Sequence, residues 1–417
     1  MSKIVKVIDS MMGTGKTSYA IQMMKEAEIN EKFIFVTPFL DEVQRIKKEV
    51  HNRDFKEPDA KHGSGTKLES LKRLISKGED IVTTHALFAM ADDELIELLS
   101  WSNYTLIMDE VMSVICQIPV RKGDIQMMLN GGAIEVDESG RVTWKEHPKF
   151  DTTFSIVRDY AIAGNLYLVN NIAFVWNFPA KIFNLFDRVY IMTYMFDGQL
   201  QKYYYDLHNV QYDYYLVVKE KNRYELGPSS DVPEDRSYLK NLIHIYEGNL
   251  NEIGHIDNTL SKSWFINNHN KVNVKCLKNN LYNFLRNIHK APADKILWTT
   301  FKDYKRKIEG NGFRKEEPEN TSKVDVGQAC FIPFNLRATN KYRHKDVLAF
   351  CLNRFIHPIE EHFFEQHNVK VDEDLLALSD LLQWIFRSAV REGKPVHIYI
   401  PSRRMRELLK KWLNNEI

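Results

Sequence analysis

The sequence predicts an α/β protein with two parallel-sheet domains in tandem and an insertion in the first. Short apolar runs rich in β-branched residues alternate with stretches of helical periodicity, first over residues 3–111 and again over residues 293–413. This alternation is typical of a parallel sheet covered by helices on both faces. The chain has 417 residues, which is enough for two or three cores of ordinary domain size.

The first half contains four expected strands and two clear helices. The strands are Lys3–Asp9, Lys32–Phe39, Asp80–Met90, which turns into a helix, and Tyr104–Val111. The helices are Thr17–Lys25 and residues 40–50.

The alternation stops over residues 112–180, where "NGGAIEVDESGRVTW" predicts a hairpin with its turn at "DESG". We interpret this stretch as an insertion whose aromatic residues close a small core of their own. A strand-separating wedge or a partner surface is the alternative. Strand character returns at Arg188–Phe196.

The boundary between the domains is expected around Tyr203–His208, which gives a first domain of residues 1–208 and a second of 209–417. The most loop-like stretch, Gly227–Ser237, lies just beyond it. In the second half, the expected strands are Ala293–Phe301, Gly327–Phe334 and Lys394–Pro401, and the expected helices are Lys345–Ile356, Asp374–Val390 and residues 402–413.

Composition narrows the class of protein. Lys and Arg (57) nearly balance Asp and Glu (56), so the net charge of +1 neither demands nor excludes a nucleic-acid partner. The four cysteines lack zinc or redox spacing and are expected to be free thiols in a reducing compartment. No apolar run approaches membrane-spanning length, so we expect a cytoplasmic protein, in the host cytoplasm if the chain is viral.

A phosphate-binding loop is the strongest motif. Ser10–Thr17 reads S-M-M-G-T-G-K-T after a strand and before a helix, and departs from G-x-x-x-x-G-K-[ST] only at its first position. The glycines let backbone N–H groups face the phosphates, Lys16 reaches the β- and γ-phosphates, and the Thr17 hydroxyl ligates Mg²⁺. The residues expected to bind the nucleotide are Gly13, Thr14, Gly15, Lys16, Thr17 and Ser18.

An acidic pair follows the fourth strand, in "TLIMDEV". Asp109 is placed to hold the magnesium ion together with Thr17, and Glu110 to polarise a water for attack on the γ-phosphate. Far along the chain, Gln383, Arg387 and Arg391 are spaced i, i+4 and i+8 on one expected helix. Arginines that reach a γ-phosphate from another domain stabilise the charge of the transition state.

A nucleoside kinase is one alternative, because "SMMGTGKT" resembles the phosphate loop of thymidine kinases. Those enzymes are short, and many carry a four-cysteine zinc site. Here no cysteine pair has zinc spacing, about 200 further residues need a role, and no acceptor-pocket signature is found. The distant arginines favour a nucleotide-driven motor instead.

In motif order the chain resembles the superfamily 2 helicases, in particular the DEAD-like helicases of bacteriophages, and more loosely the herpesvirus origin-binding helicases. Ser10–Thr17 resembles motif I, and Asp109 and Glu110 resemble motif II. Gln383, Arg387 and Arg391 resemble motif VI. Weaker matches are Val36–Val43 to motif Ia, Thr83–Phe88 to the later strand-contacting motif of the first domain, Met192–Phe196 to motif III, Ile296–Phe301 to motif IV and Phe334–Tyr342 to motif V.

Three departures qualify this resemblance. Motif II reads Asp-Glu-Val-Met, the two arginines of motif VI are four rather than three residues apart, and no room remains upstream for the adenine-reading glutamine motif. Strict ATP selectivity is therefore not implied, and a DEAD-box RNA helicase is disfavoured.

The resemblance implies two RecA-like domains that hydrolyse ATP with Mg²⁺ and act on single-stranded or forked DNA in phage replication or recombination, with RNA as the alternative partner. Other replication or recombination proteins are further expected partners. A strand lying across both domains would receive hydrogen bonds at loop starts. The residues placed for this are Thr37, Thr83, Thr84, His85, Thr300, Arg337 and Thr339.

Two other functions stay open. One is a translocase or annealing enzyme that never separates strands. The other is a nucleotide-gated DNA-binding or assembly factor. For each threonine, ordinary strand or cap chemistry is an equally good explanation.

Overall fold

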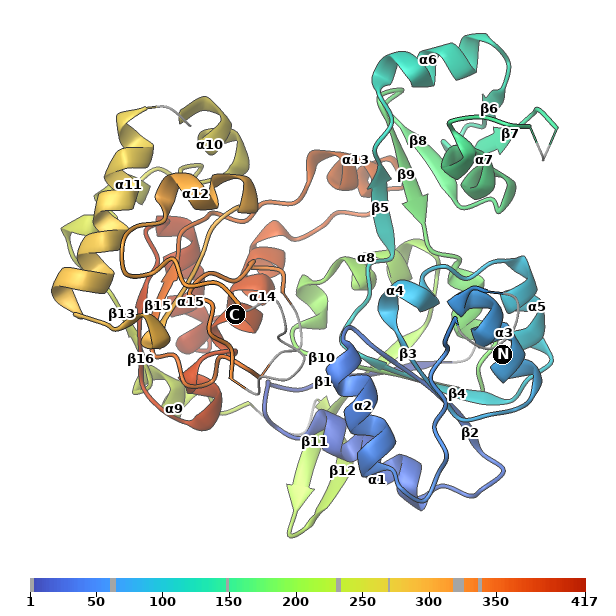
Figure 1. Cartoon of the computed structure of the whole chain (residues 1–417), viewed down its shortest axis with the longest axis horizontal. Coiled ribbons are helices and arrows are strands. Elements are labelled where there is room, and N and C mark those ends of the chain that lie inside the picture. Colours follow the sequence, from blue (N-terminus) through green and yellow to red (C-terminus); the bar gives the residue numbers. More distant parts are fainter. Residues whose placement is uncertain are drawn as a thin grey trace. The chain divides into compact units, whose positions relative to one another are not determined.

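The computed structural model describes residues 4–60, 65–147, 150–229, 234–268, 271–317, 326–336 and 340–417. The chain divides into two compact units (Figure 1). The first unit comprises residues 1–231 and 356–372, and the second comprises residues 232–355 and 373–417.

The first unit is built on a seven-stranded sheet in the order β12-β11-β1-β10-β4-β2-β3. Neighbouring strands are parallel except for β11 and β12, which form an antiparallel hairpin. The strands are β1 (Val5–Asp9), β2 (Lys32–Thr37), β3 (Ile81–Thr84), β4 (Tyr104–Asp109), β10 (Arg188–Thr193), β11 (Tyr212–Glu220) and β12 (Arg223–Pro228).

Successive side chains of the central strands enter two different cores. Phe33 and Phe35 of β2 pack in the core with residues of α1 (Lys16–Glu26) and α2 (Leu40–Glu49). Ile34 and Val36 pack in the core with residues of α3 (Lys67–Ser76) and α5 (Asp93–Ser100). The predicted parallel sheet with helices on both faces is confirmed. Two further helices connect strands of this sheet in the sequence, α4 (His85–Phe88) after β3 and α8 (Leu200–Leu207) after β10.

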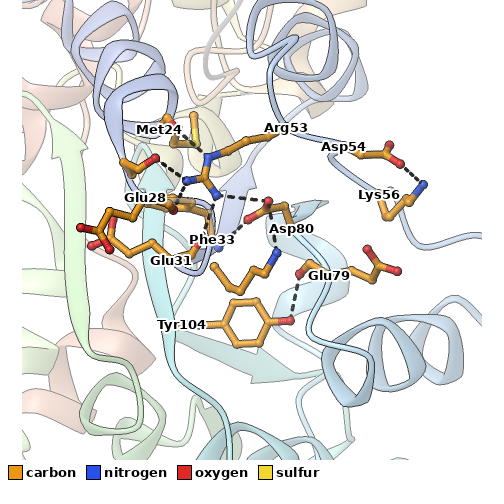
Figure 2. Close-up of polar contacts among 12 residues, drawn as sticks. Met24, Glu28, Glu31, Phe33, Arg53, Asp54, Lys56, Glu79, Asp80 and Tyr104 are labelled. Atoms are coloured by element: carbon orange, nitrogen blue, oxygen red, sulfur yellow. Dashed lines mark hydrogen bonds and ion pairs between the residues drawn. The ribbon is translucent and has the colours of Figure 1, made fainter.

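A buried arginine ties the end of α1 to the start of β2 (Figure 2). The Arg53 guanidinium donates to the carbonyls of Met24 and Glu31, each at 2.7 Å. It also lies 3.3 Å from the Asp80 carboxylate, which accepts a hydrogen bond from the Phe33 N–H at 3.0 Å. A buried charge that is paired and fully bonded in this way holds a rigid arrangement. It fixes the helix that starts in the phosphate loop.

Residues 112–180 form the expected insertion within the first unit. Its three-stranded antiparallel sheet has the order β5-β9-β8, and β6 and β7 form the expected hairpin around residues 137–141. The elements are β5 (Ile115–Ile118), α6 (Lys122–Asn130), β6 (Ile134–Val136), β7 (Val142–Trp144), α7 (Ser155–Ile162), β8 (Leu166–Val169) and β9 (Ala173–Asn177). Its buried residues belong to the same continuous core as one face of the large sheet, so the insertion does not enclose an isolated core.

A segment from late in the sequence returns to this insertion (Figure 1). Helix α13 (Pro358–Gln366) contacts β5, β8 and β9, and its Phe363 and Phe364 are fully buried. Gln366 donates to Asn170 at 3.0 Å. The first domain was expected to end at residue 208. It extends further, because β11 and β12 complete the first sheet, and α13 belongs to the first unit as well.

The second unit has a parallel sheet in the order β13-β16-β15-β14. Its strands are β13 (Ile243–Ile245), β14 (Ile296–Thr299), β15 (Val347–Phe350) and β16 (Val396–Tyr399). Its α-helices are α9 (Ser237–Lys240), α10 (Lys262–Asn268), α11 (Val272–Tyr282), α12 (Lys305–Ile308), α14 (Glu373–Ile385) and α15 (Arg403–Leu413). Trp298 and Tyr399 are completely buried in its core.

Three expectations for this unit are wrong. Lys345–Ile356 is not a helix but contains strand β15, because residues 347–352 are buried on every side and leave no polar face. Gly327–Phe334 is not a strand and contributes only an isolated bridge from Phe331 to Trp298. The helix expected to reach Val390 ends at Ile385.

Candidate nucleotide-binding site

The phosphate loop connects the end of β1 at Asp9 to the start of α1 at Lys16. Gly13 and Gly15 have φ values of +92° and +103°, a region that side chains rarely tolerate. Lys16 is 9% exposed, and its ammonium donates to the Ser10 carbonyl and, at 3.2 Å, to the Met11 carbonyl. The loop therefore has the left-handed turns and the inward lysine that phosphate binding requires.

Ser10 has a role that the motif alone does not reveal. Its hydroxyl accepts a hydrogen bond from Val217 N at 2.8 Å, and its own N–H donates to Thr193 O at 3.1 Å. Ser10 thereby links the loop to β11 on one side of β1 and to β10 on the other. A glycine at this position would lose the first of these bonds.

The acidic pair ends β4 at the same edge of the sheet, with β10 between it and β1. Asp109 is buried, and its carboxylate accepts a long hydrogen bond from Thr37 at 3.4 Å. Burial, and then the nearby charges of Glu110 and Glu42, raise the pKa of Asp109 to about 7. Lys16 opposes this shift.

Glu110 adopts a left-handed backbone with φ of +68°, and its N–H donates to Met192 O at 2.9 Å. Its Oε2 atom is buried and has no hydrogen-bond partner within the part of the chain that the structure describes. A buried carboxylate oxygen without a partner is costly and often marks a functional position.

These residues fit a magnesium–nucleotide complex. A cation would relieve the repulsion between the buried Asp109 carboxylate and the half-buried Glu110 carboxylate. Over the described residues, no group of three or more His, Cys, Asp or Glu side chains could hold a metal. Magnesium in such sites takes only one or two protein ligands, and phosphate oxygens and waters complete its shell, so Thr17 and Asp109 would suffice.

Asp9 is a further carboxylate near the site, half-buried at the end of β1, that no sequence motif revealed. Its two oxygens accept hydrogen bonds from Met195 N at 2.7 Å and Phe196 N at 2.9 Å. Burial raises the pKa of Asp9 to about 6, although these two bonds act in the opposite direction. Met195 is left-handed, with φ of +55°. Asp9 thus holds the turn after β10 against the base of the phosphate loop.

The three motif VI residues do not share one helix. Gln383 lies on α14, where its amide is 3.5 Å from the Ser379 hydroxyl, but α14 ends at Ile385. The backbone N–H and hydroxyl of Ser388 both bond to the Ile385 carbonyl, which terminates the helix. Arg387 follows in a turn and is only 4% exposed, whereas Arg391 lies in a 3₁₀ turn (Ala389–Glu392) and is exposed. The expected common helical face is corrected.

The residues expected to contact nucleic acid fall into different environments. The hydroxyls of Thr37 and Thr300 are buried, and the latter donates to Cys351 O at 3.0 Å. Thr84 caps α4 by accepting from Leu87 N, and the half-buried His85 begins this helix. Thr83 is buried next to them. Arg337 and Thr339 lie outside the described residues.

Comparisons with known proteins show the family. Residues 115–176 match the YonV middle domain, and residues 237–413 match the YonV C-terminal Rossmann-like domain. The SPbeta prophage-derived uncharacterized protein YonV of Bacillus subtilis (strain 168) is 42% identical over 423 residues, which cover 99% of each chain. The chain belongs to the YonV family.

Solved structures show the fold of this YonV-family chain. XPD in its apo form matches with a TM-score of 0.55 and 14% identity, over 99% of this chain and 95% of the XPD chain. Xpd4 of S. tokodaii matches with a TM-score of 0.48 and 11% identity, over 98% and 94% of the two chains. XPD-like helicases have tandem RecA-like domains, so the predicted fold class is confirmed. None of the described helices combines the length and hydrophobicity needed to span a membrane.

Proposed function

We propose that this YonV-family chain is an ATP-dependent nucleic-acid helicase or translocase, of the superfamily 2 DEAD-like type, acting on DNA in phage replication or recombination. One observation carries the proposal: the phosphate loop after β1 and the acidic pair after β4 meet at the same edge of one sheet. The buried Glu110 Oε2 there lacks a partner within the described ranges, as expected for a group that orients water only when nucleotide is bound.

The roles follow from this arrangement. Lys16 binds the β- and γ-phosphates, Thr17 and Asp109 hold Mg²⁺, and Glu110 orients the attacking water. The guanidinium groups of Arg387 and Arg391 stabilise the negative charge of the transition state. Gln383 belongs to the same motif. Their separation into a buried and an exposed arginine favours different roles for the two.

A nucleic-acid path is proposed along the same edge of the sheet. In the sheet order, β2 separates β3 from β4. Thr83, Thr84 and His85 lie at the C-terminal end of β3. Hydroxyl and imidazole groups at the end of a strand suit contacts to backbone phosphates, which carry little sequence information. Thr37, whose hydroxyl bonds Asp109, is better assigned to the acidic pair than to nucleic acid.

Strand displacement separates the helicase from its rivals. We expect the protein with ATP and Mg²⁺ to displace the labelled strand of a forked DNA faster than that of a blunt duplex, and Lys16→Ala to abolish displacement. ATP hydrolysis without displacement on either substrate would contradict strand separation and favour the translocase or annealing enzyme. Slow turnover that DNA does not stimulate would favour the nucleotide-gated binding or assembly factor.

A further inference from the structure

The β11–β12 hairpin lies beside the phosphate loop on the side away from the acidic pair. In the sheet order, β11 and β12 follow β1 on one side, while β10 and β4 follow it on the other (Figure 1). The hairpin is tied to the loop by the bond from Val217 N to the Ser10 hydroxyl at 2.8 Å. It is therefore a fixed neighbour of the loop.

Tyr224 of β12 packs directly on the phosphate loop. A Cβ atom placed on Gly15 would come within 2.2 Å of the Tyr224 Cε1 atom, so the ring occupies the space that a side chain at position 15 would need. The Tyr224 backbone is held by the Gln22 amide of α1, which accepts from Tyr224 N at 2.9 Å and donates to Tyr224 O at 3.1 Å. The Lys219 ammonium lies 5.6 Å from the ring centroid.

A pocket of about 350 Å³ opens between α1 and this hairpin. Its aromatic walls include Tyr19 and Tyr224. Its polar groups include the ion pair of Arg223 with Glu26 at 2.7 Å beside the hairpin. The pair of Arg188 with Glu31 lies at the far end of the pocket, where β10 and β2 begin. Aromatic faces combined with a few donors and acceptors are typical of a site for a small, flat ligand.

The direction of a bound triphosphate decides which ligand part reaches this pocket. The proposed function places the γ-phosphate and Mg²⁺ toward Asp109 and Glu110, on the β4 side of the loop. The α-phosphate end would then lie toward β11 and Tyr224, next to the end of the pocket that Tyr19 and Tyr224 line.

We propose that this pocket, with Tyr224 as its stacking residue, binds the base and ribose of a purine nucleoside triphosphate. The inference rests on the proposed nucleotide site. Stacking favours the larger face of a purine, whereas the paired arginines and glutamates present both donors and acceptors and do not single out one purine.

Binding of ATP, GTP, CTP and inorganic tripolyphosphate to the full-length protein, measured by calorimetry with Mg²⁺, tests the proposal. Tripolyphosphate has no base, so it reports on the phosphate loop alone. We expect CTP to bind more weakly than ATP and GTP. Tyr224→Ala should weaken ATP and GTP binding roughly tenfold and leave tripolyphosphate binding unchanged, and Tyr224→Phe should keep normal affinities. Tyr238→Ala, at an exposed tyrosine of the second unit, is the matched control.

Two results would overturn the base site. An equal loss of tripolyphosphate and ATP affinity in Tyr224→Ala would mean that the ring only supports the loop, and unchanged ATP affinity would mean that the base lies elsewhere. Lys16→Ala should weaken the binding of all four ligands. It therefore distinguishes a failure of the base site from a failure of the proposed function. If the unmodified protein binds neither ATP nor tripolyphosphate, the proposed function fails, and the base site with it.

Discussion

Glu110→Gln is expected to lower ATP turnover by about 10²–10⁴-fold, the range over which a positioned acid or base contributes to catalysis, while nucleotide binding persists. Glu110 directly follows β4 and is half-buried, and its buried Oε2 atom has no partner among the described residues. A glutamine side chain has the same shape and keeps the packing, and the backbone N–H of residue 110 still donates to Met192 O. The side-chain amide, however, cannot accept a proton from water.

Steady-state phosphate release and equilibrium ATP binding should be measured on the same preparation. Glu138→Gln makes the same chemical change at an exposed position in the β6–β7 turn and serves as the control. Hydrolysis by Glu110→Gln at the unmodified rate would remove Glu110 from the mechanism. Loss of ATP binding in this variant would indicate a structural rather than a catalytic role.

Asp109→Asn is expected to stabilise the first unit at pH 8 in the absence of nucleotide and Mg²⁺. Burial raises the pKa of Asp109 from 3.8 when unfolded to about 7 when folded. The folded state therefore holds the proton more tightly, and stability falls as pH rises from about 4 to 7, with the full penalty above 7. At 1.36 kcal/mol per pKa unit, the penalty removed at pH 8 is roughly 2–4 kcal/mol.

Thermal unfolding at pH 8 and pH 5 checks this expectation. The gain should be largest at pH 8 and shrink at pH 5, where folded Asp109 is already protonated. Mg²⁺ with ATP should stabilise the unmodified protein more than the variant, since the variant lacks a metal ligand. Asp213→Asn, at an exposed aspartate of β11, is the control. Destabilisation at pH 8, or the same change at both pH values, would contradict a desolvated active-site carboxylate.

The first sheet and its phosphate loop could be predicted because local signals agree there. In β2, consecutive apolar residues face two different cores, so the run "FIFV" indicates a buried parallel strand without any knowledge of distant residues. The phosphate loop combines left-handed glycines, an inward lysine and a helix start, all within Ser10–Thr17. Such features are fixed by neighbours in sequence.

The features missed depend on distant residues. Phe363 and Phe364 of α13 are buried against the insertion, and Gln366 of the same helix bonds Asn170, 196 positions away, which no local periodicity reveals. Val347–Phe350 was expected to be helical because a short apolar run fits either a buried strand or a buried helix. The helix end at Ile385 depends on one serine that bonds its carbonyl twice. Likewise, Tyr224 lies 209 positions from Gly15 and carries no motif.

The ATPase rate of the unmodified protein shows whether it is a nucleic-acid motor. It should be measured in parallel without nucleic acid and with single-stranded DNA, duplex DNA or RNA. We expect hydrolysis that requires Mg²⁺, rises several-fold with single-stranded DNA, and is lost in Lys16→Ala. A protein that binds ATP but hydrolyses none, or whose rate no nucleic acid changes, would contradict a nucleic-acid motor.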